Sequence, residues 1–165
     1  MSIDGKIQAL IIPLRSMNLI VPQVLVVEII PVPHIVEVGD LPWASGIFDW
    51  RDQKIPLISI ERFCNPEVES LSAHRSRRVA VLNGLGHTSG VTQYGIEISS
   101  IPHPVRLGED DMVVMPTGKP CEVVAQQVQA VGVKGIVPDF PALEKRVAES
   151  LKRWRESGQK SPSSA

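Results

Sequence analysis

The chain has 165 residues, of which 17 are basic and 18 acidic, so its formal net charge is −1. This balance argues against a nucleic-acid-binding protein, which usually needs a basic surplus, and three Trp, three Phe and one Tyr are too few for a base-stacking platform. A chain of this length can bury roughly 70% of its unfolded surface, so neither a disulfide nor a metal is required for stability.

The hydropathy pattern predicts no membrane segment. The most apolar stretch, residues 19–38, is interrupted by three prolines, by Glu28 and by His34, so it cannot cross a bilayer as one unbroken helix. Residues 1–10 lack the basic segment and apolar run of a secretory signal. We therefore expect a cytoplasmic protein with no direct membrane insertion.

Up to residue 138 the sequence predicts a mostly β protein. Fourteen prolines and twelve glycines separate short runs rich in β-branched residues, a pattern typical of sandwiches and small barrels. The predicted strands are Ile7–Leu14, Leu19–Val21, Val24–Ile30, Ile55–Ile60, Val79–Leu82, Val91–Ile98, Pro104–Leu107, Glu122–Val128 and Gln129–Val137.

The connections indicate how this single domain, residues 1–165, is organised. Arg15–Asn18 has the length and polarity of a hairpin connection, whereas the prolines and glycines between Pro31 and Trp50 predict a long irregular link. The charged segment 65–76 is predicted to be an exposed loop. We place the boundary between two barrel halves there, which gives the following units: a first half at 7–65 and a second half at 77–138.

The pattern becomes helical from Asp139 onward. Asp139 is a suitable N-cap, and Pro141 suits the first turn of a helix. We expect a helix over 139–157 and a disordered polar tail over 158–165. Its apolar residues recur at spacings that place them on one face: Leu143, Val147, Leu151 and Trp154.

No motif for catalysis, a cofactor or a metal is found in the sequence. The glycine-rich segment 79–90 follows a strand, but a dinucleotide site would need a helix next, and an alternating strand follows instead. The four histidines lack ligand-like spacing, and the consecutive acids at 109–111 are typical of a solvated turn. We expect no enzymatic activity, no cofactor and no bound metal.

The chain has two cysteines, Cys64 and Cys121. The interpretation that we favour is a pair of small buried or half-buried thiols. The sequence does not exclude a disulfide between them, so it leaves their pairing open.

The segment 24–60 carries a specific combination of motifs. A strand contains Val26-Val27-Glu28-Ile29, and a proline-rich connection leads through Pro42 to Gly46. The positions that follow are Gly46, Ile47, Trp50, Arg51, Ile55, Pro56, Leu57, Ile58 and Ile60. In number, order and spacing this segment resembles the first half of CheW-like domains, and a weaker resemblance extends over residues 7–155.

The resemblance implies two five-stranded, SH3-like barrels with a C-terminal α-helix, and a non-enzymatic adaptor that couples chemoreceptors to a histidine kinase. It places Val26 and Glu28 on the patch that binds the regulatory domain of the kinase. An apolar anchor beside one charge suits a small interface. From the residues alone, Val26 pointing into a barrel while Glu28 faces water is an equally good interpretation.

The second partner that the resemblance implies is the cytoplasmic tip of a methyl-accepting chemoreceptor. The residues predicted to bind it, or to structure the adjacent loop, are Gly46, Arg51, Trp43 and Trp50. For Arg51 we favour the structural role, with its guanidinium bonded to backbone carbonyls and with Asp49 and Asp52 as local partners. Gly46 is expected at a turn with positive φ. The two tryptophans are either lids on the core or interface contacts.

Several positions depart from the usual CheW pattern. Asp52 follows the arginine where glycine is common, and Asp49-Trp50 replaces an Asn-Leu pair. Ile136-Val137-Pro138-Asp139 stands where an uninterrupted apolar strand and a Leu-Asp pair are typical. These changes resemble the ChpC-like branch, which serves pilus-driven twitching motility. They keep open an alternative function, an auxiliary CheW-like protein that binds only the receptor or only the kinase.

Overall fold

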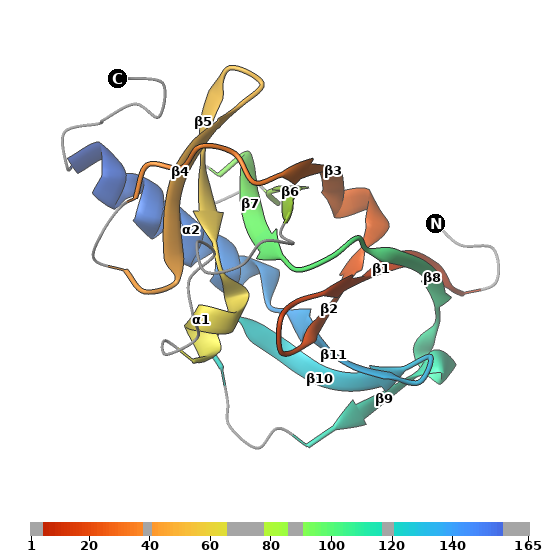
Figure 1. Cartoon of the computed structure of the whole chain (residues 1–165). Helices are drawn as coiled ribbons and strands as arrows, with labels where there is room; N and C mark the ends of the chain where they lie inside the picture. The colour runs from red at the N-terminus through yellow and green to blue at the C-terminus, as the bar shows by residue number, and fades with distance from the viewer. Residues whose placement is uncertain (1–4, 38–40, 66–77, 86–90, 117–120, 157–165) are drawn as a thin grey trace.

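The computed structural model describes residues 5–37, 41–65, 78–85, 91–116 and 121–156, which form two curled β-sheets and two α-helices (Figure 1). In spatial order, sheet A contains β8 (His103–Leu107), β1 (Ile7–Pro13), β2 (Asn18–Pro22), β11 (Val133–Pro138), β10 (Val124–Ala130) and β9 (Met112–Met115). Sheet B contains β3 (Val26–Pro31), β6 (Arg78–Asn83), β7 (Gln93–Ile98), β5 (Gln53–Ile58) and β4 (Ala44–Trp50). The helical elements are η1 (Gln23–Leu25), α1 (Ile60–Cys64), η3 (Glu109–Asp111) and α2 (Phe140–Glu156).

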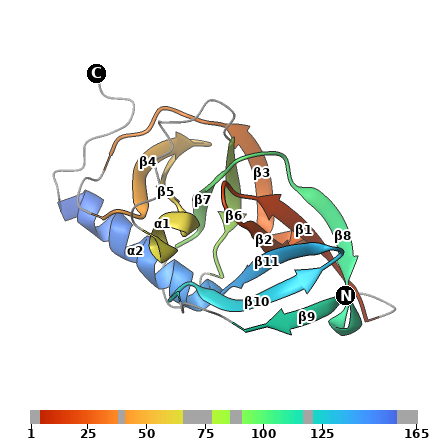
Figure 2. The ribbon, with the colours of Figure 1, turned by 60° about the horizontal axis from the view of Figure 1, so that its bottom comes forward.

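The predicted fold class, mostly β with a C-terminal helix, is confirmed, but the boundary between the barrel halves is wrong. β6 and β7 lie beyond the segment 65–76, yet they pair with β3 and β5 in sheet B. β1 and β2 pair with β8 and β11 in sheet A (Figure 2). Both sheets thus combine strands from the predicted halves 7–65 and 77–138. Local turn signals mark where a strand ends but not which sheet it joins.

Two described strands are missing from the predicted list. β4 lies within the link that we expected to be irregular. A bulge between Ala44 and Gly46 interrupts its alternating pattern, so periodicity does not reveal this strand. β9 is only four residues long, too short for periodicity to identify, and it makes sheet A six-stranded rather than five-stranded. The turn between β10 and β11 lies at Val131 and Gly132, three residues later than predicted.

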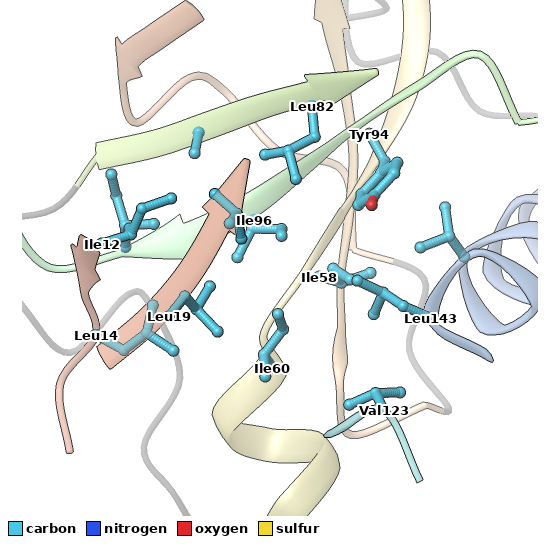
Figure 3. Close-up of a cluster of buried hydrophobic side chains, with 14 of the residues drawn as sticks. Ile12, Leu14, Leu19, Ile58, Ile60, Leu82, Tyr94, Ile96, Val123 and Leu143 are labelled. Atoms are coloured by element: carbon cyan, nitrogen blue, oxygen red, sulfur yellow. The ribbon is translucent and has the colours of Figure 1, made fainter. Parts of the chain in front are cut away.

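Alternate residues of the inner strands face two different apolar clusters. In β6, Val79 and Val81 lie inside the barrel of sheet B, whereas Ala80 and Leu82 face a cluster to which both sheets and both α-helices contribute (Figure 3). Burial on both faces explains why such strands read as continuous apolar runs. We call the second cluster the shared core: Ile12, Leu14, Leu19, Val21, Ile58, Ile60, Ala80, Leu82, Val91, Tyr94, Ile96, Ile98, Val123, Ile136, Leu143 and Val147.

The C-terminal helix follows the sequence prediction closely. The Asp139 side chain accepts a hydrogen bond from the Ala142 amide at 3.1 Å, which caps the first turn. Leu143 and Val147 belong to the shared core, and Trp154 is also buried. The helix packs against β4 and β5, so it covers one edge of sheet B while its apolar face contributes to the shared core.

Two further links connect α1 to sheet A. The buried Glu61 carboxylate accepts hydrogen bonds from the Arg15 and Ser16 amides, both at 2.8 Å, in the turn between β1 and β2. At the end of α1, Cys64 forms a disulfide with Cys121, with the two Cα atoms 5.2 Å apart. The free-thiol interpretation is therefore wrong, because only the fold brings these two residues, 57 positions apart, into contact.

The shared core contains one polar atom that lacks a hydrogen-bond partner among the described residues, the Tyr94 hydroxyl. Burial raises the pKa of this hydroxyl, and the nearby Glu144 carboxylate raises it further. The group therefore stays protonated, and its desolvation is not offset by a hydrogen bond.

We predict that Tyr94→Phe leaves the free energy of unfolding unchanged or raises it by up to about 1 kcal/mol, because it removes a buried, unsatisfied hydroxyl. Tyr94→Ala should lower the free energy of unfolding by roughly 3–5 kcal/mol, because it leaves a cavity. Urea unfolding of both variants measures these changes. A loss of more than about 1 kcal/mol in Tyr94→Phe would show that the hydroxyl has a partner.

Candidate docking surface

Glu28 lies where the two edge strands of sheet B approach each other. Its carboxylate, on β3, accepts a hydrogen bond from the Trp50 indole at 2.9 Å and another from the Arg51 guanidinium at 3.3 Å. The Arg51 guanidinium also lies over the Trp50 ring, 4.5 Å from its centroid. We call these three residues the Glu28 cluster. The cluster joins Glu28, which was predicted to bind the kinase, to Trp50 and Arg51, which were predicted to bind the receptor or to structure the adjacent loop.

The turn between β4 and β5 positions Arg51 in this cluster. Arg51 and Asp52 have φ values of 47° and 62°, so both adopt the left-handed conformation of a two-residue hairpin turn between Trp50 and Gln53. Aspartate is among the few non-glycine residues enriched in that conformation, which explains how Asp52 replaces the glycine that is common in the family. The departure at this position therefore leaves the turn intact.

The expected local partners of Arg51 are wrong. Asp49 pairs with Lys54 at 3.4 Å, and the Arg51 guanidinium contacts Glu28 and Trp50 rather than backbone carbonyls. The pairing of β4 with β5 and the curl of sheet B bring β3 beside the turn. Spacing along the chain does not reveal a contact between residues 23 positions apart.

A backbone bridge links the loop after β3 to β4. Val36 and Ile47 exchange two hydrogen bonds of 2.9 Å each. Gly46 precedes this bridge with φ of 147°, and a Cβ atom there would collide with the Val36 carbonyl oxygen and approach Ile35 Cγ2 to 2.6 Å. The positive φ that we expected at Gly46 is present, and the residue is required by geometry.

Val26 is half-buried, and the exposed valine of this segment is Val24. A bulge between Val26 and Glu28 turns the Val26 side chain toward the shared core, and Val27 packs inside the barrel of sheet B. Val24, on η1, is 82% exposed, and Ile7, on the strand that contacts η1, is 51% exposed. We had assigned Val24 to a strand, so its exposure on a helical turn was not predicted.

The two tryptophans lie in different surroundings. Trp50 is buried and belongs to the core of sheet B. Trp43 is half-buried and stacks on Phe63 of α1, with ring centroids 4.3 Å apart and an interplanar angle of 14°. The Trp43 carbonyl accepts a hydrogen bond from the Ser59 amide at 2.8 Å. Trp50 thus belongs to the Glu28 cluster, whereas Trp43, directly before β4, packs on α1.

The described part of the chain contains neither a metal-binding cluster nor a membrane-spanning helix. No three His, Cys, Asp or Glu residues of that part gather as a metal would require. Within the same residues, neither helix combines the length and the apolar character needed to cross a membrane.

Comparison with known proteins assigns these features to a family. The family model described as CheW-like domain matches residues 8–120, well over half of the chain. The chain belongs to the CheW-like domain family. Its fold is similar to the crystal structure of the scaffolding protein TtCheW from Thermoanaerobacter tengcongensis, with a TM-score of 0.62 and 16% identity, over 80% of this chain and 88% of that one. A comparison with curated proteins found no match.

We predict that Glu28→Ala lowers the free energy of unfolding of this CheW-like protein by roughly 1–3 kcal/mol, because the buried Trp50 indole loses its acceptor. Glu28→Gln keeps an acceptor oxygen and loses only an exposed ion pair, so it should lower the free energy by less than about 1 kcal/mol. Urea unfolding compares the two variants. Equal losses in both would contradict the role of Glu28 as the acceptor for Trp50.

Proposed function

We propose that this CheW-like protein is a cytoplasmic, non-enzymatic adaptor that couples a methyl-accepting chemoreceptor to a chemosensory histidine kinase. Membership of the CheW-like domain family supports an adaptor role in chemosensory signalling. The observation that carries the more specific proposal is the Glu28 cluster, because Glu28 lies on β3, directly after the η1 turn with the exposed Val24.

The surface around β3 has the composition of a small protein interface. Val24 offers an apolar side chain that is 82% exposed. The side chains of Glu28 and Arg51, which are 41% and 60% exposed, offer one charge of each sign. An apolar contact supplies affinity, while the charges fix the register of the partner. We assign this surface to the regulatory domain of the kinase, with Val24 as the anchor and Val26 as its half-buried support.

The receptor side of the proposal rests on a different element. Trp43 lies half-buried directly before β4, where its ring stacks on Phe63 of α1 and its carbonyl accepts a hydrogen bond from the Ser59 amide. A partly exposed aromatic side chain on a fixed element is the kind of residue that dominates binding energy at interfaces. We propose that the receptor tip contacts Trp43, so that the two partners approach different parts of the same adaptor.

One observation favours a variant of the auxiliary alternative, a protein that can bind either partner but only one at a time. Glu28 was predicted to bind the kinase and Arg51 the receptor, yet the two side chains are paired at 3.3 Å. If both partners require this ion pair, they compete for it, and only one can be bound at a time. The protein would then act as a spacer or modulator in a receptor array.

We predict that Val24→Lys weakens binding to the regulatory domain of the kinase at least tenfold, about 1.4 kcal/mol, with unchanged thermal stability. Val113→Lys is the matched control, because Val113 is 65% exposed on β9 of the other sheet, and we expect it to bind like wild type. Calorimetric titration measures both affinities. Equal weakening by the two variants, or none by either, would contradict the proposed surface.

Sedimentation of a three-component mixture separates the adaptor from its auxiliary alternative. A complex that contains kinase domain, adaptor and a soluble receptor fragment together supports coupling. Displacement of the kinase domain by the receptor fragment supports the protein that binds one partner at a time.

A further inference from the structure

The disulfide connects elements of the two sheets at the rim of the shared core. Cys64 is the last residue of α1, which follows β5 of sheet B. Cys121 lies shortly before β10 of sheet A, and it packs against the shared core together with Phe63. Both cysteines are half-buried, so a small thiol can reach this edge of the core.

The fold has enough other contacts to persist without this bond. The shared core includes sixteen buried residues drawn from both sheets and both α-helices. Glu61 separately ties α1 to the turn between β1 and β2. A domain of this length does not need a disulfide to be stable, so the oxidised and the reduced chain can both fold. Two folded states are what a reversible thiol site requires.

The bond acts on a short element, α1, that packs against Trp43. α1 has only five residues, and Phe63, next to Cys64, stacks on Trp43. The N-terminal end of α1 is held by the Ser59 side chain, which accepts a hydrogen bond from the Arg62 amide at 3.3 Å. Oxidation fixes the opposite end to sheet A. Reduction leaves that end with the Asn65–Glu61 backbone hydrogen bond and the aromatic stack.

We propose that Cys64 and Cys121 form a reversible redox site that exchanges with low-molecular-weight thiols and disulfides and sets the position of Trp43. The inference rests on the proposed function for its cytoplasmic setting, where structural disulfides are rare and those that form are mostly transient or redox-sensing. The site deepens that function by placing the receptor-binding tryptophan under redox control.

The exchange balances with glutathione as the co-reactant. One protein thiolate attacks glutathione disulfide, forms a mixed disulfide and releases one glutathione thiolate. The second protein thiolate attacks the protein sulfur of the mixed disulfide and releases the second glutathione. Two electrons pass from the protein dithiol to one glutathione disulfide, and the reverse sequence reduces the protein.

The test equilibrates the full chain in mixtures of reduced and oxidised glutathione that span cytoplasmic ratios. Alkylation with iodoacetamide, read by mass spectrometry, counts the free thiols, and tryptophan emission reports on Trp43. We expect the thiol count to change from zero to two within this range, with red-shifted emission on reduction. Cys64→Ser should abolish the response of the emission, and Trp43→Phe should abolish it while keeping the thiol titration.

Three outcomes would overturn the proposal. If the pair stays oxidised throughout the range, it is a structural bond. If it stays reduced throughout, the bond does not form. If the thiols titrate while the emission stays constant, Trp43 is not coupled to the bond. The assay contains no receptor or kinase, so its failure leaves the adaptor function untouched, and failure of partner binding leaves this site untouched.

Discussion

The shared core is the constraint on which the rest of the molecule depends. Because β1, β2 and β6 bury alternate apolar side chains in it and the others inside a barrel, the inner parts of these strands have no face left for a partner. The side chains that are available to a partner are therefore confined to the edge strands, turns and short helices around them. The Glu28 cluster, the exposed Val24 and the Trp43 stack all lie in such places.

Glu28 has two roles that a binding experiment can confuse. Its carboxylate is the acceptor for a buried indole, and it also contributes charge to the surface together with Arg51. A charge reversal at this position removes the acceptor and places two positive groups side by side, so weaker binding would also follow from local disruption of the barrel. The exposed Val24 is a cleaner probe, because its side chain belongs to none of the apolar clusters.

The sequence was sufficient for the fold class, for most strands and for the capped C-terminal helix, because each depends on local periodicity and turn chemistry. It was insufficient for features that depend on contacts between distant segments. Glu28 with Trp50 is set by the curl of sheet B, whereas Glu61 with Ser16 and Cys64 with Cys121 are set by how α1 packs against sheet A. The same limit explains the misplaced boundary at 65–76, where β6 and β7 return to sheet B. It also explains the exposure of Val24, which follows from its position on η1 rather than from its residue type.

Amide hydrogen exchange of the adaptor, alone and bound to the regulatory domain of the kinase, tests the central claim most directly, since it maps the contact surface without altering any side chain. We predict slower exchange in η1, in β3 and in the turn between β4 and β5, with β9 and β10 unchanged. Protection confined to β9 and β10, with η1 and β3 unchanged, would contradict it.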